Sequence, residues 1–429
     1  MTSEKAVTAI RGMYDILPGD ALQWRQVEAQ VAGVFSQYAY NEIRTPIVES
    51  TRLFNRAIGE ATDIVEREMY SFIDSLNGEA LTLRPEGTAS CVRAVLQHSL
   101  CYNDSQRLWY SGPMFRHERP QKGRARQFHQ IGAEAFGYAG PHVDVEQIAI
   151  CSRLWNVLEI APLRLEINTL GTPESRSRFR AVLVDFLRAN KSQLDADSLR
   201  RLDTNPLRIL DSKNDQVQAV VARAPSLIDY LDQESLGQFE RVKESLEELG
   251  ISFLFNPRLV RGLDYYSHLV YEWKFDALGA QGTVCARGRY DGLSEQLGGP
   301  PLPGCGFAMG LERIFALKEL NAHAALIQHP DVFVVASGSG VLLAANRVAE
   351  QIRDLGLGVQ VEFSGTSFRS QMKRASQTGA RFAVIIGETE LGSGTVAIKR
   401  LDAGTHGTGG QQQVSMEQAG TWILAQQAV

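Results

Sequence analysis

The segment from Phe115 to Gln130, "FRHERPQKGRARQFHQ", gathers five arginine and lysine side chains and two histidines within sixteen residues. Glu118 is its one acidic residue. The guanidinium group of arginine is planar, stays protonated and presents paired N–H donors that match phosphate oxygens. The segment is therefore suited to clamp a polyphosphate, although a solvated basic loop is the alternative. Four side chains could form the clamp: Arg116, Arg119, Arg124 and Arg126.

The residues that follow the basic segment could add a ligand-sized notch. If residues 127–137 form a strand, Phe128, Gln130, Gly132 and Glu134 share one face. Glycine then leaves a gap between an amide and a carboxylate, which could accept a small cationic or hydrogen-bonding ligand. Phe128 offers a flat surface on which a nucleobase could stack. The alternative is that Glu134 simply faces solvent.

Two later segments add further candidate residues. "RGLDYYSHLVYEW" contains Arg261 and the pair Tyr265–Tyr266, and "GFAMGLERI" places Arg313 at the start of a helix. Strict strand alternation separates Arg261 from Tyr266 unless Gly262 breaks the register. A tyrosine pair in a strand is also ordinary packing. Because neither a Walker P-loop nor a strand-anchored G-x-G-x-x-G is present, any bound nucleotide must be held by arginines.

Composition sets broad limits on these possibilities. The chain has 429 residues, 44% of them apolar, and a formal net charge of −5. Its length favours two or three domains. It has no run of eighteen apolar residues, and "MTSEKAVTAIRG" lacks the apolar core of a signal peptide, so we expect a cytoplasmic protein with no membrane partner. The five widely spaced cysteines indicate free thiols and no metal site.

Hydrophobic periodicity indicates how the candidate residues are positioned. It predicts a helix at 21–40, followed by the edge strand "NEIRTPIVES", and a further helix at 88–99. Two aromatic-rich strands flank the polar loop 119–125 and predict a long hairpin. The region 173–250 reads as a mainly helical insertion. Two domains follow from these patterns: 1–325, with the hairpin, further strand-like segments and the helical insertion, and 331–429, with alternating strands and helices.

Taken together, the motifs resemble those of bacterial histidyl-tRNA synthetases, which are class II aminoacyl-tRNA synthetases. Motif 1 is similar to 21–40 with "NEIRTPIVES", motif 2 to "GPMFRHERPQKGRARQFHQIGAEAFG", and motif 3 to "GFAMGLERI". The histidine signatures resemble "LVRGLDYY" and "ARGRYDGL", and "TLRPEGTAS" resembles the substrate loop. The resemblance runs from residue 11 to the C-terminal domain, and all six segments stand in the family's order.

The resemblance implies an α+β catalytic domain, with an antiparallel sheet of six or seven strands flanked by helices, and a C-terminal α/β anticodon-binding domain. The implied activity is ATP-dependent ligation of L-histidine to its tRNA through a histidyl-adenylate. The implied partners are L-histidine, ATP with Mg²⁺, the tRNA for histidine and a second copy of the chain. No tightly bound cofactor is implied.

The resemblance also implies residue roles. Arg116 and Arg261 are the implied catalytic pair, flanking the α-phosphate of ATP. Phe128 and Arg313 would sandwich the adenine, while Glu134 and Tyr266 would contact the imidazole nitrogens. The implied histidine-binding residues are Glu86, Gly87, Thr88, Arg116, Gln130, Glu134, Arg261, Tyr265, Tyr266 and Tyr290. The implied ATP-binding residues are Arg116, Glu118, Arg124, Phe128 and Arg313.

Two positions depart from the family pattern: Arg287 stands where glycine is usual, and Ala125 replaces an aromatic residue. The alternative function is a regulatory subunit of the histidine-biosynthetic phosphoribosyltransferase, which resembles the catalytic domain. That family lacks the anticodon domain and much of the arginine set. In the C-terminal domain, the segment 367–378, with Arg369, Lys373 and Arg374, is the candidate tRNA contact.

Overall fold

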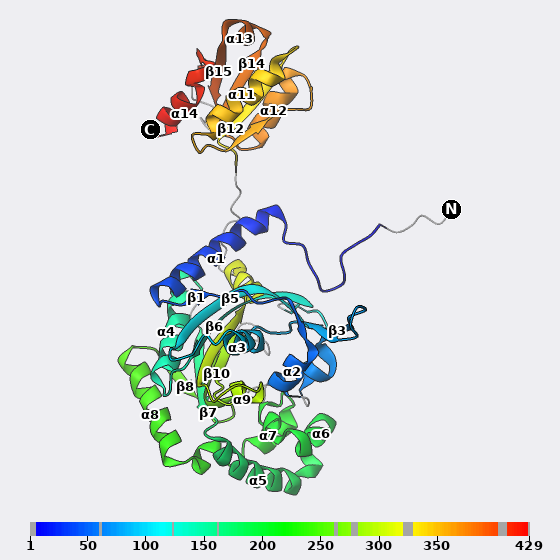
Figure 1. Cartoon of the computed structure of the whole chain (residues 1–429), viewed down its shortest axis with the longest axis vertical. Coiled ribbons are helices and arrows are strands. Elements are labelled where there is room, and N and C mark those ends of the chain that lie inside the picture. Colours follow the sequence, from blue (N-terminus) through cyan, green and yellow to red (C-terminus); the bar gives the residue numbers. More distant parts are fainter. Residues whose placement is uncertain are drawn as a thin grey trace, which may run out of the picture. The chain divides into compact units, whose positions relative to one another are not determined.

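The computed structural model describes residues 6–427 except 60–61, 122–123, 161–162, 261–264, 276–281, 321–328 and 402–409. The chain divides into two compact units, residues 1–324 and 325–429. Figure 1 shows the large mixed unit that carries most of the chain and the smaller unit that ends in α14 (Ala419–Gln427). The candidate residues of the sequence analysis belong mainly to the first unit.

An eight-stranded sheet forms the centre of the first unit. Its six inner strands are antiparallel, as the family resemblance implied, and they include pairs between segments far apart in the sequence, such as β6 with β11. The two additional edge strands, β1 and β8, pair in parallel with their neighbours, so a sheet of six or seven strands was an underestimate. The order is β1 (Asn41–Glu42), β5 (Gln106–Phe115), β6 (Gln127–Phe136), β11 (Gly304–Gly310), β10 (Thr283–Arg289), β9 (Ser267–Lys274), β7 (Arg164–Thr169) and β8 (Phe253–Phe255).

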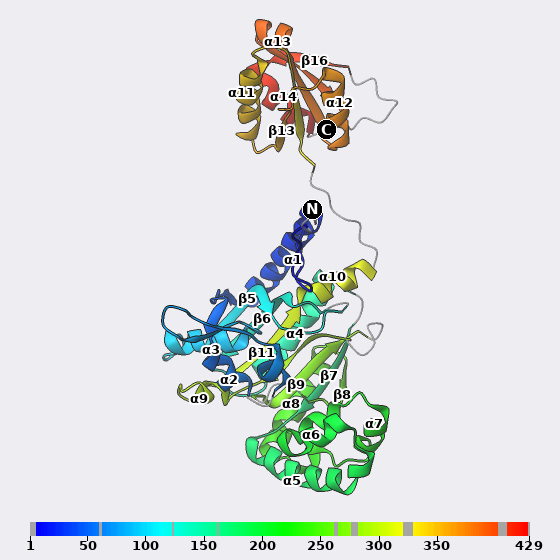
Figure 2. The same cartoon turned by 90° about the vertical axis from the view of Figure 1, so that its right-hand side faces the viewer.

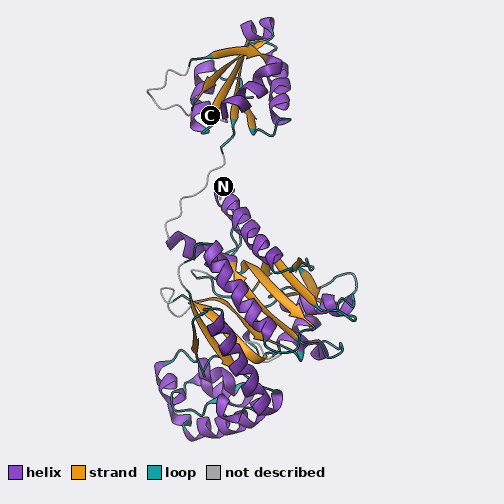
Figure 3. Cartoon of the chain, turned by 90° about the vertical axis from the view of Figure 1, so that its left-hand side faces the viewer, coloured by secondary structure: helices purple, strands orange, loops and turns teal. Residues whose placement is uncertain are grey.

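Long helices cover one face of this sheet (Figure 3). Their apolar side chains join those of the strands in a continuous core that includes Val31, Ile148, Leu154 and Phe307. Packing closes that face in the described part of the chain. The covering helices are α1 (Pro18–Gln37), α4 (His142–Val157), α8 (Gln233–Glu248) and α10 (Leu311–Leu320).

The helix predicted at 21–40 starts and ends earlier than expected. Pro18 occupies its first turn, where a missing N–H costs nothing, and Asp20 complements the positive end of the helix dipole. The helix stops at Gln37, and Ala39 adopts a positive φ of 57° that turns the chain.

The predicted edge strand "NEIRTPIVES" divides into β1 and β2 (Val48–Ser50), with Pro46 between them. The second piece belongs to a separate three-stranded sheet with β4 (Ala80–Leu83) and β3 (Tyr70–Ile73). Three short helices lie in the same unit: α2 (Thr51–Ile58), α3 (Thr88–Gln97) and α9 (Leu293–Gln296).

The region predicted as a helical insertion is helical, but its last helix has a different role. Figure 2 shows α5, α6 and α7 gathered beside one end of the sheet. In contrast, Phe239, Val242 and Leu246 of α8 pack into the core under the sheet. The three gathered helices are α5 (Pro173–Ala189), α6 (Ala196–Thr204) and α7 (Asp215–Val221).

Asp232 ties the start of α8 to α5. Its carboxylate accepts hydrogen bonds from the Ser235 N–H (2.7 Å) and the hydroxyls of Ser235 and Ser175 (2.9 Å each). The Ser235 N–H contributes most to lowering the pKa of Asp232 from 3.8 to about 2. Because folding lowers this pKa, the ionised carboxylate stabilises the fold above about pH 4 and loses that effect as the pH falls further.

Asp232→Ala is therefore expected to lower the free energy of unfolding by about 1 kcal/mol near neutral pH, as for other helix N-caps. The deficit relative to wild type should shrink as the pH falls through the window between the two pKa values. Urea denaturation at several pH values measures both effects. Asp232→Asn keeps the cap without the charge and should lose less stability. A deficit that is independent of pH would contradict the assigned role of the charge.

The second unit is a mixed sheet with helices on its faces, the small α/β domain that the sequence predicted. Parallel pairs join β12 to β13 and β14, and antiparallel pairs add β15 and β16. Its strands are β12 (Val332–Ser337), β13 (Val359–Val361), β14 (Phe382–Gly387), β15 (Thr395–Arg400) and β16 (Gln412–Ser415). Its other helices are α11 (Val341–Arg353), α12 (Phe368–Gln377) and α13 (Glu388–Ser393).

The five cysteines are free thiols, as predicted, and four of them are buried. Cys151 and Cys285 lie closest, with 3.7 Å between their sulfur atoms. Burial is the largest cause of the raised pKa of the Cys151 thiol, which keeps it in the unreactive protonated form. Among the described residues, no helix is long and apolar enough to cross a membrane, and no group of three or more His, Cys, Asp or Glu side chains could hold a metal ion.

Candidate active site

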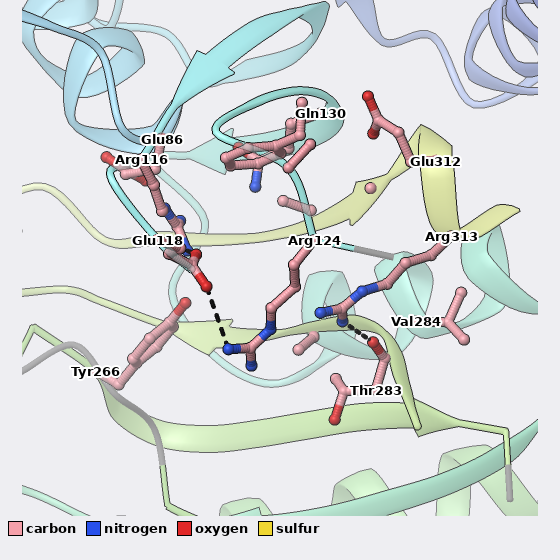
Figure 4. A pocket seen from close by; sticks show the side chains of 15 residues that line it. Glu86, Arg116, Glu118, Arg124, Gln130, Tyr266, Thr283, Val284, Glu312 and Arg313 are labelled. Atoms are coloured by element: carbon pink, nitrogen blue, oxygen red, sulfur yellow. Dashed lines mark hydrogen bonds and ion pairs between the residues drawn. The ribbon is translucent and has the colours of Figure 1, made fainter. Parts of the chain in front are cut away.

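A cavity of about 210 Å³ opens on the sheet face that the long helices leave free. Strands β6, β11 and β10 form its floor, and the β5–β6 loop and the start of α10 form its walls (Figure 4). Its lining is unusually rich in charge for an otherwise apolar sheet. The lining residues are Glu86, Arg116, Glu118, Arg124, Ala125, Phe128, Gln130, Tyr266, Thr283, Val284, Ala286, Ala308, Gly310, Glu312 and Arg313.

The β5–β6 hairpin supplies one wall. Arg116, directly after β5, lies with its guanidinium carbon 5.2 Å from the ring centre of Phe128 and donates from Nε to the Pro85 carbonyl (2.9 Å). Arg124, in the loop, donates to the Glu118 carboxylate at 3.1 Å. The hairpin therefore presents two guanidinium groups and an aromatic face to the same space.

Arg313 reaches the cavity from the opposite wall. It is the third residue of α10 and donates a hydrogen bond to the Thr283 carbonyl on β10. Burial lowers its pKa, and the charges of Arg124 and Arg116 lower it further. A buried guanidinium that is repelled by two others gains free energy when an anion enters, because the anion relieves the repulsion. The cavity is thus prepared for a negatively charged ligand.

The end of the cavity near α3 is built to accept positive charge. The Glu86 carboxylate accepts hydrogen bonds from the first N–H groups of α3, those of Thr88 (2.9 Å) and Ala89 (2.7 Å). These bonds fix the orientation of the Glu86 carboxylate at the start of the helix. Within the part of the chain that the structure describes, the buried Oε1 of Gln130 has no hydrogen-bond partner. A ligand ammonium group would satisfy this oxygen.

Glu134 is fully buried beside this end of the cavity, so the solvent-facing alternative was wrong. Its carboxylate accepts hydrogen bonds from the hydroxyls of Thr88 (2.7 Å), Tyr110 (3.1 Å) and Tyr290 (2.5 Å). Three donors from three separate segments hold one carboxylate in a single orientation. Such a fixed acceptor can distinguish ligands by the hydrogen bonds that they offer.

The glycine notch predicted on β6 exists, but a protein side chain fills it. A Cβ atom at Gly132 would lie 2.3 Å from the Tyr110 ring, and one at Gly87 would also lie 2.3 Å from it. The two glycines therefore admit Tyr110, which then reaches Glu134. On the other side, a Cβ at Gly306 would lie 1.7 Å from the Glu134 carboxylate, so glycine is needed there as well.

Most of the residues predicted from the sequence converge here. Tyr265, Tyr266 and Tyr290 form linked ring contacts of 4.6 and 5.8 Å at the Glu134 end. Two members of the predicted arginine clamp, Arg119 and Arg126, do not line the cavity, so that part of the prediction was wrong. Arg126 instead donates to the Glu118 carbonyl, which stabilises the loop.

Arg261 lies outside the described residues. Tyr110, Gly306 and Glu312 also contribute to the site or its support, and the motifs did not single them out. For Gly306, the two glycines that flank Cys305 in "GCGFAMG" were the available sequence signal, because glycine allows another side chain to approach the strand backbone closely.

The histidyl-tRNA synthetase family model matches residues 12–314, and an anticodon binding domain model matches residues 331–426. The histidine–tRNA ligase of Nitrosomonas europaea is 56% identical over 395 residues, covering 92% of this chain and 94% of that protein. The chain belongs to the histidyl-tRNA synthetase family. It is a class II aminoacyl-tRNA synthetase, and ligation of histidine to tRNA is the reaction of this family.

Solved structures agree with this membership. The apo histidyl-tRNA synthetase of S. aureus matches with a TM-score of 0.80 and 33% identity, covering 97% of this chain and 100% of that one. A Bacillus halodurans chain described as an ATP phosphoribosyltransferase regulatory subunit/histidyl-tRNA synthetase matches with a TM-score of 0.61 at 21% identity, covering 90% and 98%. The second likeness shows a shared fold alone.

Both departures from the family pattern lie near the site. Ala125 lines the cavity and is almost fully buried. Arg287 lies within β10, where it pairs with Phe307 on one side and Tyr271 on the other. The backbone at this position is regular strand and not left-handed. Arginine in place of glycine therefore causes no backbone strain there.

Proposed function

We propose that this chain activates L-histidine with MgATP to form histidyl-adenylate and then transfers the histidyl group to the terminal ribose of its tRNA. In the first step, a histidine carboxylate oxygen attacks the α-phosphorus of ATP and pyrophosphate leaves. In the second, a ribose hydroxyl attacks the adenylate carbonyl and AMP leaves. The observation that carries the proposal is that three arginines line one cavity, while the buried carboxylate of Glu134 is held close to its Glu86 end by the Thr88 hydroxyl.

The three arginines would bind and activate ATP. Arg116 would contact the α-phosphate, Arg124 the terminal phosphates, and Arg313 would lie opposite Phe128 across the adenine. Glu118 would contact the edge of the adenine. Attack of one anion on another builds negative charge on the phosphate oxygens, and fixed guanidinium groups stabilise that charge without needing a protein nucleophile. Arg261, the implied partner of Arg116, belongs to this proposal through the family resemblance.

The acidic end of the cavity would bind the amino acid. Glu86 and the unpartnered oxygen of Gln130 would hold the α-ammonium, together with the Thr88 hydroxyl. Glu134 and Tyr266 would contact the two imidazole nitrogens, with Tyr265 and Tyr290 packed around them. A site built to pair both nitrogens rejects side chains that leave its buried polar groups unpaired. Gly87 contributes by admitting Tyr110 behind the substrate.

The domain roles complete the proposal. Residues 1–325 would carry out both chemical steps, and residues 331–429 would bind the anticodon arm, with Arg369 and Lys373 of α12 as candidate phosphate contacts. A homodimer formed through motif 1 and a cytoplasmic location follow from the family resemblance. Mg²⁺ would enter with ATP as part of the substrate.

Histidine-dependent exchange of radiolabelled pyrophosphate into ATP tests the first step without tRNA. The folded protein is expected to catalyse exchange with L-histidine and not with other amino acids. Aminoacylation of tRNA measured in parallel tests the second step. A well-folded preparation that shows no exchange would contradict the enzyme proposal and favour the regulatory subunit, which needs no such arginine set. Arg287→Gly, compared in both assays, measures what the departure in β10 changes.

A further inference from the structure

Glu312 lies next to Arg313 at the start of α10, but its carboxylate points away from the Arg313 guanidinium (Figure 4). Its carboxylate accepts the backbone N–H of His129, with distances of 2.8 and 3.1 Å to its two oxygens. The same carboxylate lies 3.1 Å from Nδ1 of the His129 ring. One side chain at the start of a helix thus holds both the backbone and the side chain of a residue on β6.

The contact occurs where the ladder between β6 and β11 stops. The last pair of that ladder joins Gly310 to Gln130, and β11 then turns into α10. His129 is the next residue of β6, and its N–H would have no strand partner on that side. A backbone N–H without a partner at the end of a ladder lets the strand end fray. The Glu312 carboxylate accepts this N–H in place of a β11 carbonyl, and so extends the hydrogen bonding of β6 by one residue.

The residue immediately beyond this point is Phe128, whose ring lies beneath the Arg116 guanidinium. Gln130, on the other side, is already held by β5 and β11. The loss of the Glu312 contact would therefore release Phe128 more than Gln130. Phe128 pairs with Met114 of β5 but lies beyond the end of the β11 ladder, so we expect the adenine end of the cavity to depend on this contact more than the amino-acid end.

An aromatic residue from α1 supports the arrangement. The Trp24 ring meets the His129 ring edge-on, with 4.7 Å between centroids, and stacks on Phe315 at 4.8 Å. Phe315 stands one helical turn after Glu312 on α10, so its ring and the Glu312 carboxylate belong to the same side of the helix. Trp24 thereby packs β6, α10 and α1 together at the position that Glu312 holds.

We propose that Glu312 is a positioning residue for ATP, which extends the β6 ladder past the end of β11 and so fixes Phe128 against the adenine. This inference rests on the proposed function, because it assigns adenine to Phe128. Glu312 acts through His129 and not by contact with the reacting atoms. His129, which binds Glu312, and Trp24, which packs on His129, help to hold β6 in this position.

Glu312→Gln tests the proposal. We expect the KM for ATP in pyrophosphate exchange to rise about tenfold, the effect of losing charge-assisted hydrogen bonds, while kcat and the KM for histidine change less than about twofold. The affinity for a non-hydrolysable ATP analogue should fall by a similar factor. Glu295→Gln, which removes the same charge from an exposed position on α9, should leave all values unchanged.

Variants of His129 test the same proposal independently. His129→Asn keeps a donor near the position of Nδ1 and should retain the wild-type KM for ATP within about twofold, whereas His129→Leu should raise it several-fold. Unchanged ATP affinity in Glu312→Gln would overturn the inference, as would equal losses for ATP and histidine. Absence of exchange in the wild-type protein would instead contradict the proposed function, and the ATP-analogue measurement would still decide the role of Glu312.

Discussion

Arg116→Ala is expected to lower kcat for histidine-dependent pyrophosphate exchange by roughly a hundredfold or more, the usual effect of removing one preorganised donor from a developing anion. Arg116 is held by the Pro85 carbonyl and the Phe128 ring, so its guanidinium is oriented before ATP arrives. Its interaction with the α-phosphate should strengthen as charge accumulates during attack. The KM values for ATP and histidine should therefore change much less than kcat.

Two variants control this experiment. Arg116→Lys keeps the charge but loses the planar pair of donors, so its kcat should fall between those of wild type and Arg116→Ala. Arg119→Ala removes an arginine from the same loop that is exposed and does not line the cavity, so exchange should stay within about twofold of wild type. A large rise in KM with an unchanged kcat would show that Arg116 binds ground state and transition state equally.

Glu134→Gln is expected to raise the KM for histidine on the order of a hundredfold, with little change in the KM for ATP. Glu134 is fully buried and accepts hydrogen bonds from Thr88, Tyr110 and Tyr290, so its orientation is fixed before the ligand binds. Glutamine has nearly the same shape but replaces an acceptor oxygen with a donor. An imidazole N–H would then face an N–H group, and discrimination against other amino acids should weaken.

Glu166→Gln is a matched control, because Glu166 is also a buried glutamate on the same sheet. It accepts hydrogen bonds from Lys274 (2.8 Å) and Asn256 (2.7 Å), away from the cavity. Its replacement should lower thermal stability without altering the KM for histidine. Thermal unfolding of both variants separates folding from binding. An unchanged KM for histidine in folded Glu134→Gln would contradict the proposed imidazole contact.

Local sequence patterns predicted much of the fold. Alternation in β5 and β6 identified the hairpin, the helical period identified α1 and α3, and the change near residue 331 identified the second domain. These are properties of segments that form their own hydrogen bonds. Edge strand β8 was missed, and β1 was predicted only as part of a longer edge strand, because two or three residues carry no readable period and their pairing depends on longer neighbours.

The order and type of the motifs in the sequence alone determined the family and identified eight of the residues that line the cavity, among them Arg116, Gln130 and Arg313. Only the tertiary structure decided which charged residues line the cavity. Arg119 and Arg126 are arginines of the same segment as Arg116, but their side chains do not line the cavity. Strand ends and loop hydrogen bonds, such as that from Arg126 to the Glu118 carbonyl, set where each side chain points. Tyr110 filling the notch at Gly132, and Glu312 extending a ladder, arise from contacts between distant segments, which no local pattern encodes.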